Sequence, residues 1–270
     1  MSEIETVFSK SGKETEWTQI NSFHLPNRAM NFGDGLFETM VFDRDHIRFL
    51  NHHLARLKHG LEVLNLDESN LDFEGLEFFL FKNYSGQKLR VRWNVFRSGS
   101  GKYTPQNSMT EQTLQISTFI SAPHVKNTAF FSSKIRLYPT VWSGCKTLNA
   151  LPYVLANQER AEAKMDEVIL LNNRGFLSEA GSSNLFWRKG GEYFTPSLEC
   201  SCLNGVARKV ILEELILLEL PIQVGDFLPE ELLDADQVWV SNVIGISYLA
   251  QINQKEYSTD PLPVFQNLFD

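Results

Sequence analysis

The chain has 270 residues, of which 43% are hydrophobic and 21% charged, a composition of ordinary soluble globular proteins with length for one large domain or two modest ones. Its 25 Lys and Arg residues are outweighed by 33 Asp and Glu residues, the net charge is −8, and no basic block interrupts this balance. We therefore expect a small-molecule partner, and neither a nucleic acid nor an anionic membrane surface.

Residues 1–120 show a regular succession of strand and helix patterns. The turn-forming clusters 33–35 and 43–45 delimit strands. Leu54, Leu57 and Leu61 recur at helical spacing. The expected elements, in order, are a pair of strands within 31–49, a helix over 51–64, a helix over 71–82, a strand over 88–96 with one charged face, and a strand over 114–120.

The pattern of predicted strands and helices changes near residue 120, which indicates a domain boundary. Residues 121–124 contain Pro123, which has no amide hydrogen and biases the residue before it towards an extended conformation. We expect a small N-terminal domain over 1–120, a linker over 121–125 and a larger domain over 126–270.

Residues 126–270 carry strands and helices in an irregular order. Gly205 and Pro221 bracket one helix with a start and a stop that helix chemistry favours. The irregular order indicates an α+β fold and not a regular doubly wound sheet. The expected elements are strands over 129–138, 167–172, 184–189, 192–195 and 237–242, and helices over 149–164 and 206–219.

The N-terminal residues and the cysteines bear on the compartment. Residues 1–20 resemble neither a signal peptide nor a membrane span, and no later stretch reaches about 18 consecutive apolar residues. Without a secretory signal, Cys145, Cys200 and Cys202 are expected to be reduced thiols. We therefore expect a cytoplasmic protein.

Generic catalytic motifs are absent. The sequence has no Gly-x-Gly-x-x-Gly, no phosphate loop ending in Gly-Lys-Ser/Thr, no His-Glu-x-x-His and no Gly-x-Ser-x-Gly. Cys200 and Cys202 have no further Cys or His at zinc spacing, so we expect loop residues and no metal site. His52, His53 and His59 lie on or beside the first helix without carboxylates at complementary spacing, which favours a solvated helix face.

Two short segments are unremarkable when each is taken alone. Residues 33–38 predict a tight turn entering a strand, because Gly tolerates positive φ and Asp stabilises turns. Residues 144–149 predict a loop with a surface lysine, Lys146, that leads into a helix. Their interpretation changes because two further segments, 175–186 and 203–208, follow them in order.

These ordered segments resemble the fold-type IV pyridoxal-phosphate (PLP) enzymes. This is the class IV aminotransferase family, which holds branched-chain and D-amino-acid aminotransferases and 4-amino-4-deoxychorismate lyase. Residues 33–39 are similar to its Gly-Asp-Gly-x-Phe-Glu turn and 53–57 to its His-x-x-Arg-Leu helix. The resemblance implies a two-domain α+β fold like that of D-amino-acid aminotransferase, with a small N-terminal α/β domain and a larger C-terminal α+β domain that binds PLP.

The resemblance also implies roles for three residues. Lys146 is implied as the catalytic lysine that binds the cofactor covalently and then moves protons at the substrate carbon. Glu179 is implied as the partner of the pyridine nitrogen, where a carboxylate maintains the ring as an electron sink. Arg56 is implied as a phosphate ligand, because a guanidinium fork suits a phosphate dianion. Taken alone, these residues would be a surface lysine, a capped turn and a surface helix arginine.

Two further positions are implied to hold the cofactor phosphate. Val206 and Ala207 open a helix, whose N-terminus offers free N–H groups and a positive dipole end to an anion. Many relatives have Thr where Ala207 stands, so one hydroxyl contact is missing here. Ser241 and Asn242 are implied as a second cradle for the same phosphate.

Within the family, the sequence is most similar to the bacterial 4-amino-4-deoxychorismate lyases. Residues 184–190 carry this likeness, and residues 97–103 resemble the Arg-Gly-Ser-Gly-Gly-Arg-Gly-Tyr loop of the lyase. The Pro-Arg-x-His element of D-amino-acid aminotransferases is absent. Branched-chain enzymes usually have an Asn-Tyr pair after the lysine, whereas Asn149 is followed by Ala150.

The lyase resemblance implies formation of 4-aminobenzoate and pyruvate in folate biosynthesis, with Arg97 and Lys102 contacting a substrate carboxylate. One departure leaves a second activity open, because Glu38 follows the aminotransferase-like Phe-Glu pattern where a lyase subset has Thr-Thr. The alternative is an aminotransferase acting on branched-chain or other amino acids with 2-oxoglutarate. A non-catalytic member would not be expected to retain the lysine, the acid and the arginine together. The family is dimeric, so a homodimer is expected.

Overall fold

The computed structural model describes residues 6–11, 14 and 16–269, which form two compact units. The first unit comprises residues up to Ile120 together with Cys145–Asn149, and the second comprises Ser121–Gly144 and the residues from Ala150 onward. We expected 145–149 within the C-terminal domain. The structure groups this segment with the first unit instead, because its backbone pairs with a strand there.

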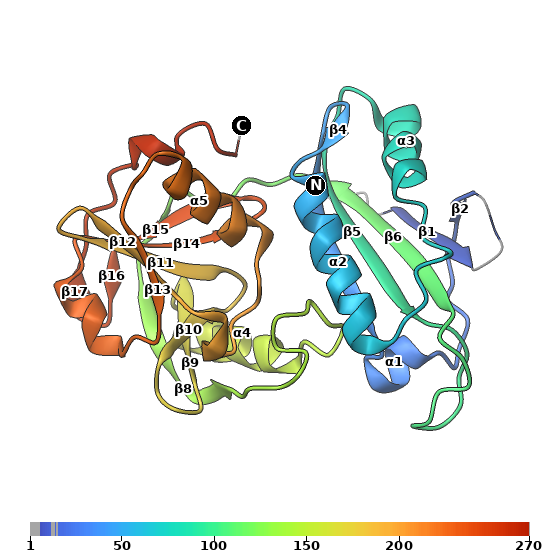
Figure 1. Ribbon diagram of the computed structural model, residues 1–270, viewed down its shortest axis with the longest axis horizontal. Helices are drawn as coiled ribbons and strands as arrows, with labels where there is room; N and C mark the ends of the chain where they lie inside the picture. The colour runs from blue at the N-terminus through green and yellow to red at the C-terminus, as the bar shows by residue number, and fades with distance from the viewer. Residues whose placement is uncertain (1–5, 12–13, 15, 270) are drawn as a thin grey trace. The chain divides into compact units, whose positions relative to one another are not determined.

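The first unit is built on a six-stranded antiparallel sheet in the order β2-β1-β6-β5-β3-β4 (Figure 1). Its strands are β1 (Thr6–Ser11), β2 (Thr18–Gln19), β3 (Gly35–Asp43), β4 (His46–Ile47), β5 (Lys88–Arg97) and β6 (Thr110–Thr118). Its helices are α1 (Arg28–Phe32), α2 (Leu50–Leu64) and α3 (Phe73–Tyr84).

The alternation that predicted β5 explains how the first unit forms its core. Leu89, Val91, Trp93 and Val95 are buried, whereas the polar residues between them are partly exposed. This follows from the strand period of two, which sends successive side chains to opposite faces of the sheet. The buried face packs against the leucines of α2. The predicted charged face of this strand is thus confirmed.

The second unit contains an eleven-stranded mixed sheet, in the order β17-β16-β8-β9-β10-β11-β14-β15-β7 with β12 and β13 branching from β11. The strands are β7 (Val125–Lys126), β8 (Ala129–Leu137), β9 (Glu167–Asn172), β10 (Leu177–Ala180), β11 (Asn184–Lys189), β12 (Glu192–Pro196), β13 (Ile222–Gly225), β14 (Gln237–Asn242), β15 (Gly245–Leu249), β16 (Gln251–Ile252) and β17 (Lys255–Glu256). The helices are α4 (Leu151–Ala163), α5 (Val206–Leu217), and the 3-10 turns η1 (Leu198–Cys200), η2 (Pro229–Asp234) and η3 (Pro263–Phe265).

Both faces of the central strands in the second unit are covered. On β11, Phe186 stacks on Trp239 at a centroid distance of 5.7 Å, while Trp187 stacks on Phe194 at 5.6 Å on the other face. Ile211 of α5 packs with the first of these stacks. Burial on two faces explains why β9, β11 and β14 are nearly continuous apolar runs. Among the described residues, no helix combines the length and the apolar character that a membrane span requires.

Candidate active site

The segment that carries Lys146 forms backbone hydrogen bonds with the start of β3. The backbone N–H of Phe37 donates to the carbonyl of Lys146 at 2.8 Å, and the N–H of Leu148 donates to the carbonyl of Gly35 at 2.9 Å. The Lys146 Nζ lies 4.4 Å from the centroid of the Phe37 ring, a cation–π distance. The first unit therefore positions this lysine through backbone pairing and through one aromatic face.

A buried ionic cluster joins Glu38 of β3 to His53 and Arg56 of α2. Glu38 accepts hydrogen bonds from Arg56 Nε at 2.8 Å, from Arg56 NH2, and from His53 Nδ1 at 2.7 Å. Glu38 is 1% exposed and His53 is fully buried. The prediction of a solvated face at His53 was therefore wrong. One turn of helix separates His53 from Arg56, so both side chains can reach the same carboxylate on the strand.

The cluster has a defined protonation pattern. Burial alone would raise the pKa of Glu38, but the charge and hydrogen bonds of Arg56, together with His53, lower this pKa to about 2. Burial lowers the pKa of His53, and the positive charges of Arg56 and Lys146 act in the same direction. At neutral pH the imidazole is thus neutral and donates from Nδ1 to the ionised Glu38. Its buried Nε2 has no hydrogen-bond partner within the part of the chain that the structure describes.

In the second unit, Glu179 is surrounded by hydrogen-bond donors. It is 3% exposed and accepts from the Tyr153 hydroxyl at 2.5 Å, from the Leu203 N–H at 3.0 Å and from Asn184 Nδ2 at 3.3 Å. Burial and the neighbouring Glu179 charge raise the pKa of Tyr153 well above 10, so this phenol remains a donor. Such an arrangement stabilises a carboxylate and fixes its orientation.

The start of α5 lies close to Asn184 of β11. Gly205 caps this helix without a side-chain hydrogen bond, and Val206 and Ala207 in its first turn are buried. A Cβ at Gly205 would lie 1.8 Å from Asn184 Oδ1, so any other residue there would displace the Asn184 amide. Open helix N-termini of this kind attract anions.

Ser241 lies beside Asn184 in the register of β11 and β14. Its side chain is buried, and its Oγ has no hydrogen-bond partner among the described residues. An unsatisfied buried hydroxyl is costly, and its presence in a native site calls for a ligand or a water molecule. Asn242 differs, because its side-chain amide already donates to Ser183 Oγ at 3.0 Å and its Oδ1 accepts from the Ile244 N–H.

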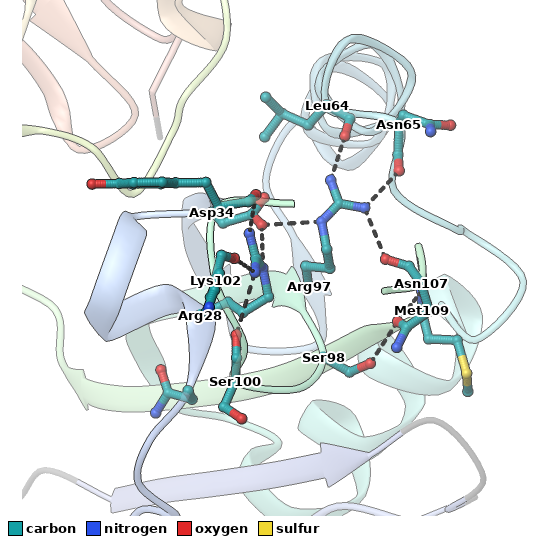
Figure 2. A network of polar contacts seen from close by, with 12 residues as sticks. Arg28, Asp34, Leu64, Asn65, Arg97, Ser98, Ser100, Lys102, Asn107 and Met109 are labelled. Carbon is teal, nitrogen blue, oxygen red and sulfur yellow. Dashed lines mark hydrogen bonds and ion pairs between the residues drawn. The ribbon is translucent and has the colours of Figure 1, made fainter. Parts of the chain in front are cut away.

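The structure gives Arg97 a different role from the one expected (Figure 2). Its guanidinium donates to Asp34 at 3.0 Å and to the carbonyls of Leu64, Asn65 and Asn107 at 2.6, 2.9 and 3.3 Å. Arg97 is 6% exposed and donates four hydrogen bonds to protein acceptors. We therefore withdraw it as a substrate contact. Lys102, the other candidate, is exposed.

The motif-based prediction missed Tyr153 and misread His53. A signal for His53 was present, because His53, Leu57 and Leu61 recur at four-residue spacing and so share the buried face of α2. For Tyr153 no comparable signal exists, since its contact with Glu179 joins α4 to a distant strand. Glu38 was noted only as part of a pattern, and its pairing with Arg56 was not foreseen.

Comparison with known proteins identifies the family. A family model described as amino-transferase class IV matches residues 35–249. The chain belongs to this family. The predicted membership of the class IV aminotransferases is thus confirmed.

Individual relatives include both lyases and aminotransferases. The aminodeoxychorismate lyase of Vibrio harveyi is 25% identical over 247 residues, which cover 88% of this class IV chain and 90% of the lyase. A branched-chain-amino-acid aminotransferase of Pseudomonas aeruginosa is 23% identical over 268 residues, 90% and 81% of the two chains. The solved structure of 4-amino-4-deoxychorismate lyase from Pseudomonas aeruginosa matches with a TM-score of 0.83 and 25% identity, covering 99% of this chain and 100% of that one. The predicted α+β, fold-type IV architecture is confirmed.

Proposed function

We propose that the chain is a PLP-dependent 4-amino-4-deoxychorismate lyase that forms 4-aminobenzoate and pyruvate, a reaction of folate biosynthesis. The observation that supports this most is the end-to-end match with the lyase from Pseudomonas aeruginosa, which leaves almost no part of either chain uncovered. We further expect a cytoplasmic homodimer, as the family resemblance implies.

The described residues fit PLP chemically. Lys146 offers a primary amine for the aldehyde of the cofactor, and Arg56 offers a guanidinium already oriented by Glu38. In the second unit, the open N-terminus of α5 and the unsatisfied Ser241 hydroxyl suit a phosphate group. We assign these groups, together with Glu179, Val206, Ala207 and Asn242, to cofactor binding.

When bound, PLP would supply an electron sink for the carbanion formed at the substrate. The amine of Lys146 removes the proton from carbon 4 of the substrate and returns a proton to the enolpyruvate that leaves, which gives pyruvate. Tyr153, Leu203 and Asn184 hold Glu179 in one orientation, and we assign this carboxylate as the group that would pair with the ring nitrogen of the cofactor. Loss of enolpyruvate makes the ring aromatic, which drives the reaction. The protein is left with positioning and proton transfer.

The covalent role of Lys146 is tested by reduction with borohydride in the presence of PLP. Mass analysis should find the cofactor attached at Lys146 in the wild type, and Lys146→Ala should abolish both the adduct and the visible absorption. Lys209→Ala, which replaces an exposed lysine of α5, serves as the control and should retain both. A wild-type protein that remains colourless after incubation with PLP would refute the assignment.

The lyase activity is tested by pyruvate release from aminodeoxychorismate without any amino acceptor. A second candidate, an aminotransferase using 2-oxoglutarate, is favoured by the similarity to a branched-chain enzyme over 90% of the chain and by the Phe37-Glu38 pattern. It would form glutamate in a coupled assay. Glutamate formation together with absence of pyruvate release would replace the lyase by the aminotransferase.

A further inference from the structure

A charged network connects the turn at 33–35 with the loop between β5 and β6, residues 98–109 (Figure 2). Asp34 Oδ2 accepts from Arg28 Nε at 2.6 Å and from Arg97 Nε at 3.0 Å. The two arginine side chains are only 6% and 7% exposed. Two guanidinium groups so deeply buried require a counter-charge, and the single carboxylate of Asp34 provides it.

The side chain of Arg28 binds backbone carbonyls at the tip of the 98–109 loop. Its NH1 donates to the carbonyls of Lys102 at 2.7 Å and Ser100 at 3.3 Å, and its NH2 donates to the carbonyl of Tyr103 at 3.3 Å. The backbone is thus fixed from the inside, while the side chains of Lys102 and Tyr103 are exposed.

Arg97 fastens the other end of the same loop. It donates to the carbonyl of Asn107, and its remaining bonds reach the carbonyls of Leu64 and Asn65 at the end of α2. The loop is therefore tied to the sheet and to a helix end by two arginines that share one acid. A loop rich in Ser and Gly would otherwise lose much conformational entropy on adopting a single conformation.

The same turn also contacts the lysine segment. Gly33 has φ +63°, and a Cβ there would lie 3.2 Å from the backbone N of Asn149. Gly35 accepts a hydrogen bond from the Leu148 N–H through its carbonyl. The backbone of the turn thus packs on residues 147–149, while its only side chain, Asp34, forms an ion pair with each of the two arginines that hold the loop.

We propose that Asp34 is a positioning residue that fixes the 98–109 loop, and with it Lys102, relative to the segment carrying Lys146. The role of the loop in recognition of a carboxylate-bearing substrate rests on the proposed function. Asp34 acts on that recognition through Arg28 and Arg97, without itself touching the substrate or the reacting atoms.

Trypsin provides a test that needs neither cofactor nor substrate. Cleavage after Lys102 requires the loop to open into an extended conformation, and Arg28 holds the carbonyl of that peptide bond. Asp34→Asn keeps the size of the side chain and removes its charge, so we expect cleavage at this bond to accelerate at least about tenfold. Asp43→Asn is the matched control, since Asp43 binds Arg48 at 2.6 Å and Lys88 at 3.1 Å at the opposite end of β3, and it should leave the cleavage rate at Lys102 unchanged.

A second variant covers the case in which Asp34→Asn unfolds the unit. Arg28→Met removes the three donors that hold the loop and leaves the Asp34–Arg97 pair balanced. Its circular dichroism should match the wild type, and its cleavage at Lys102 should also accelerate about tenfold. Wild-type cleavage rates in Arg28→Met would overturn the proposal.

Kinetics separate a positioning role from a merely structural one. In the pyruvate assay, Asp34→Asn and Arg28→Met should raise KM about tenfold and change kcat less than about twofold. A loss confined to kcat would overturn the proposed role in recognition. If the wild type releases no pyruvate, the proposed function fails, while the trypsin comparison still decides whether Asp34 and Arg28 hold the loop.

Discussion

Replacing Glu38 by Gln would leave a buried cation without its counter-charge. Glu38 is 1% exposed and Arg56 9%, so water reaches neither side chain well. Gln retains the size of the side chain and one acceptor oxygen. It loses the charge to which both Arg56 and His53 donate.

The magnitude follows from the ionisation of Glu38. Its pKa is about 2, compared with an ordinary value of 4.5. At 1.36 kcal/mol for each pKa unit, the folded state favours the ionised form by about 3 kcal/mol. Breaking a buried ion pair by removal of one partner costs about 3–5 kcal/mol. We therefore expect Glu38→Gln to destabilise the first unit by about 3 kcal/mol at neutral pH.

The assay is amide hydrogen exchange in α2 and β3, because a chain of two units need not unfold in one step and exchange reports the local free energy. The test is a double-mutant cycle with Arg56→Met. Removing both charges should cost less than the sum of the single losses, with a coupling energy of about 2–3 kcal/mol. Glu159→Gln is the control, since this buried carboxylate accepts from Ser132 and Ser133 hydroxyls and should show no coupling to Arg56. Additive losses for Glu38 and Arg56 would refute the reasoning.

Two further predictions concern pH and the cofactor. Burial lowers the pKa of His53 below 6.5, so the unfolded chain binds more protons in acid and stability falls as the pH drops below 6.5, by up to about 1.4 kcal/mol per pH unit. Between pH 6.5 and 5.5, Glu38 stays ionised in the folded chain and almost fully ionised in the unfolded chain, so His53 sets the slope. His53→Asn should lose this slope, and His46→Asn, at an exposed site, should retain it. An unchanged slope in His53→Asn would contradict the burial argument. Ser241→Ala removes an unsatisfied buried hydroxyl, so the protein without cofactor should be as stable as the wild type or more stable by up to about 1 kcal/mol. Its affinity for PLP in equilibrium dialysis should fall about tenfold, and an equal affinity would remove Ser241 from the phosphate site.

Long periodic elements could be predicted from the sequence. The helix expected over 51–64 is Leu50–Leu64, and the strands expected over 167–172 and 237–242 have the same bounds in the structure. The hydrophobic period decides these elements locally. The expected pair of strands within 31–49 is found as β3 and β4, but its first two residues belong to the short helix α1.

Short elements were missed because their partners define them. β10, Leu177–Ala180, has four residues and lies between β9 and β11, where all four of its side chains are buried. β1, Thr6–Ser11, is mostly polar and pairs along its whole length with β6. Neither segment has a periodic pattern long enough to distinguish it from a loop. Strand pairing is a tertiary interaction and overrides such weak local preference.

The same reason limits the site. Residue types and their order pointed to Lys146, Arg56 and Glu179. The pairing of Arg56 with Glu38 depends on how α2 packs on β3, which no spacing in the sequence specifies. Arg97 was misjudged because an arginine in a Ser- and Gly-rich segment looks available for a ligand. Three of its acceptors are carbonyls supplied by chain segments 10 to 33 residues away, and the fourth is the carboxylate of Asp34.

The lysine segment also has a consequence for biosynthesis. Thr147 bridges to Leu36, so the first unit receives its last segment more than a hundred residues after β3 has been made. During vectorial synthesis, a nascent chain that ends at Ile120 has the six strands of the first sheet but not the segment that covers Gly33 and Gly35. Domains tend to fold from the N-terminus as they emerge. Here the first unit is complete only after residues 145–149 have been synthesised. A fragment that ends at residue 120 would therefore contain the first sheet without Lys146. The complementary fragment would contain Lys146 without β3, the strand whose backbone pairs with it.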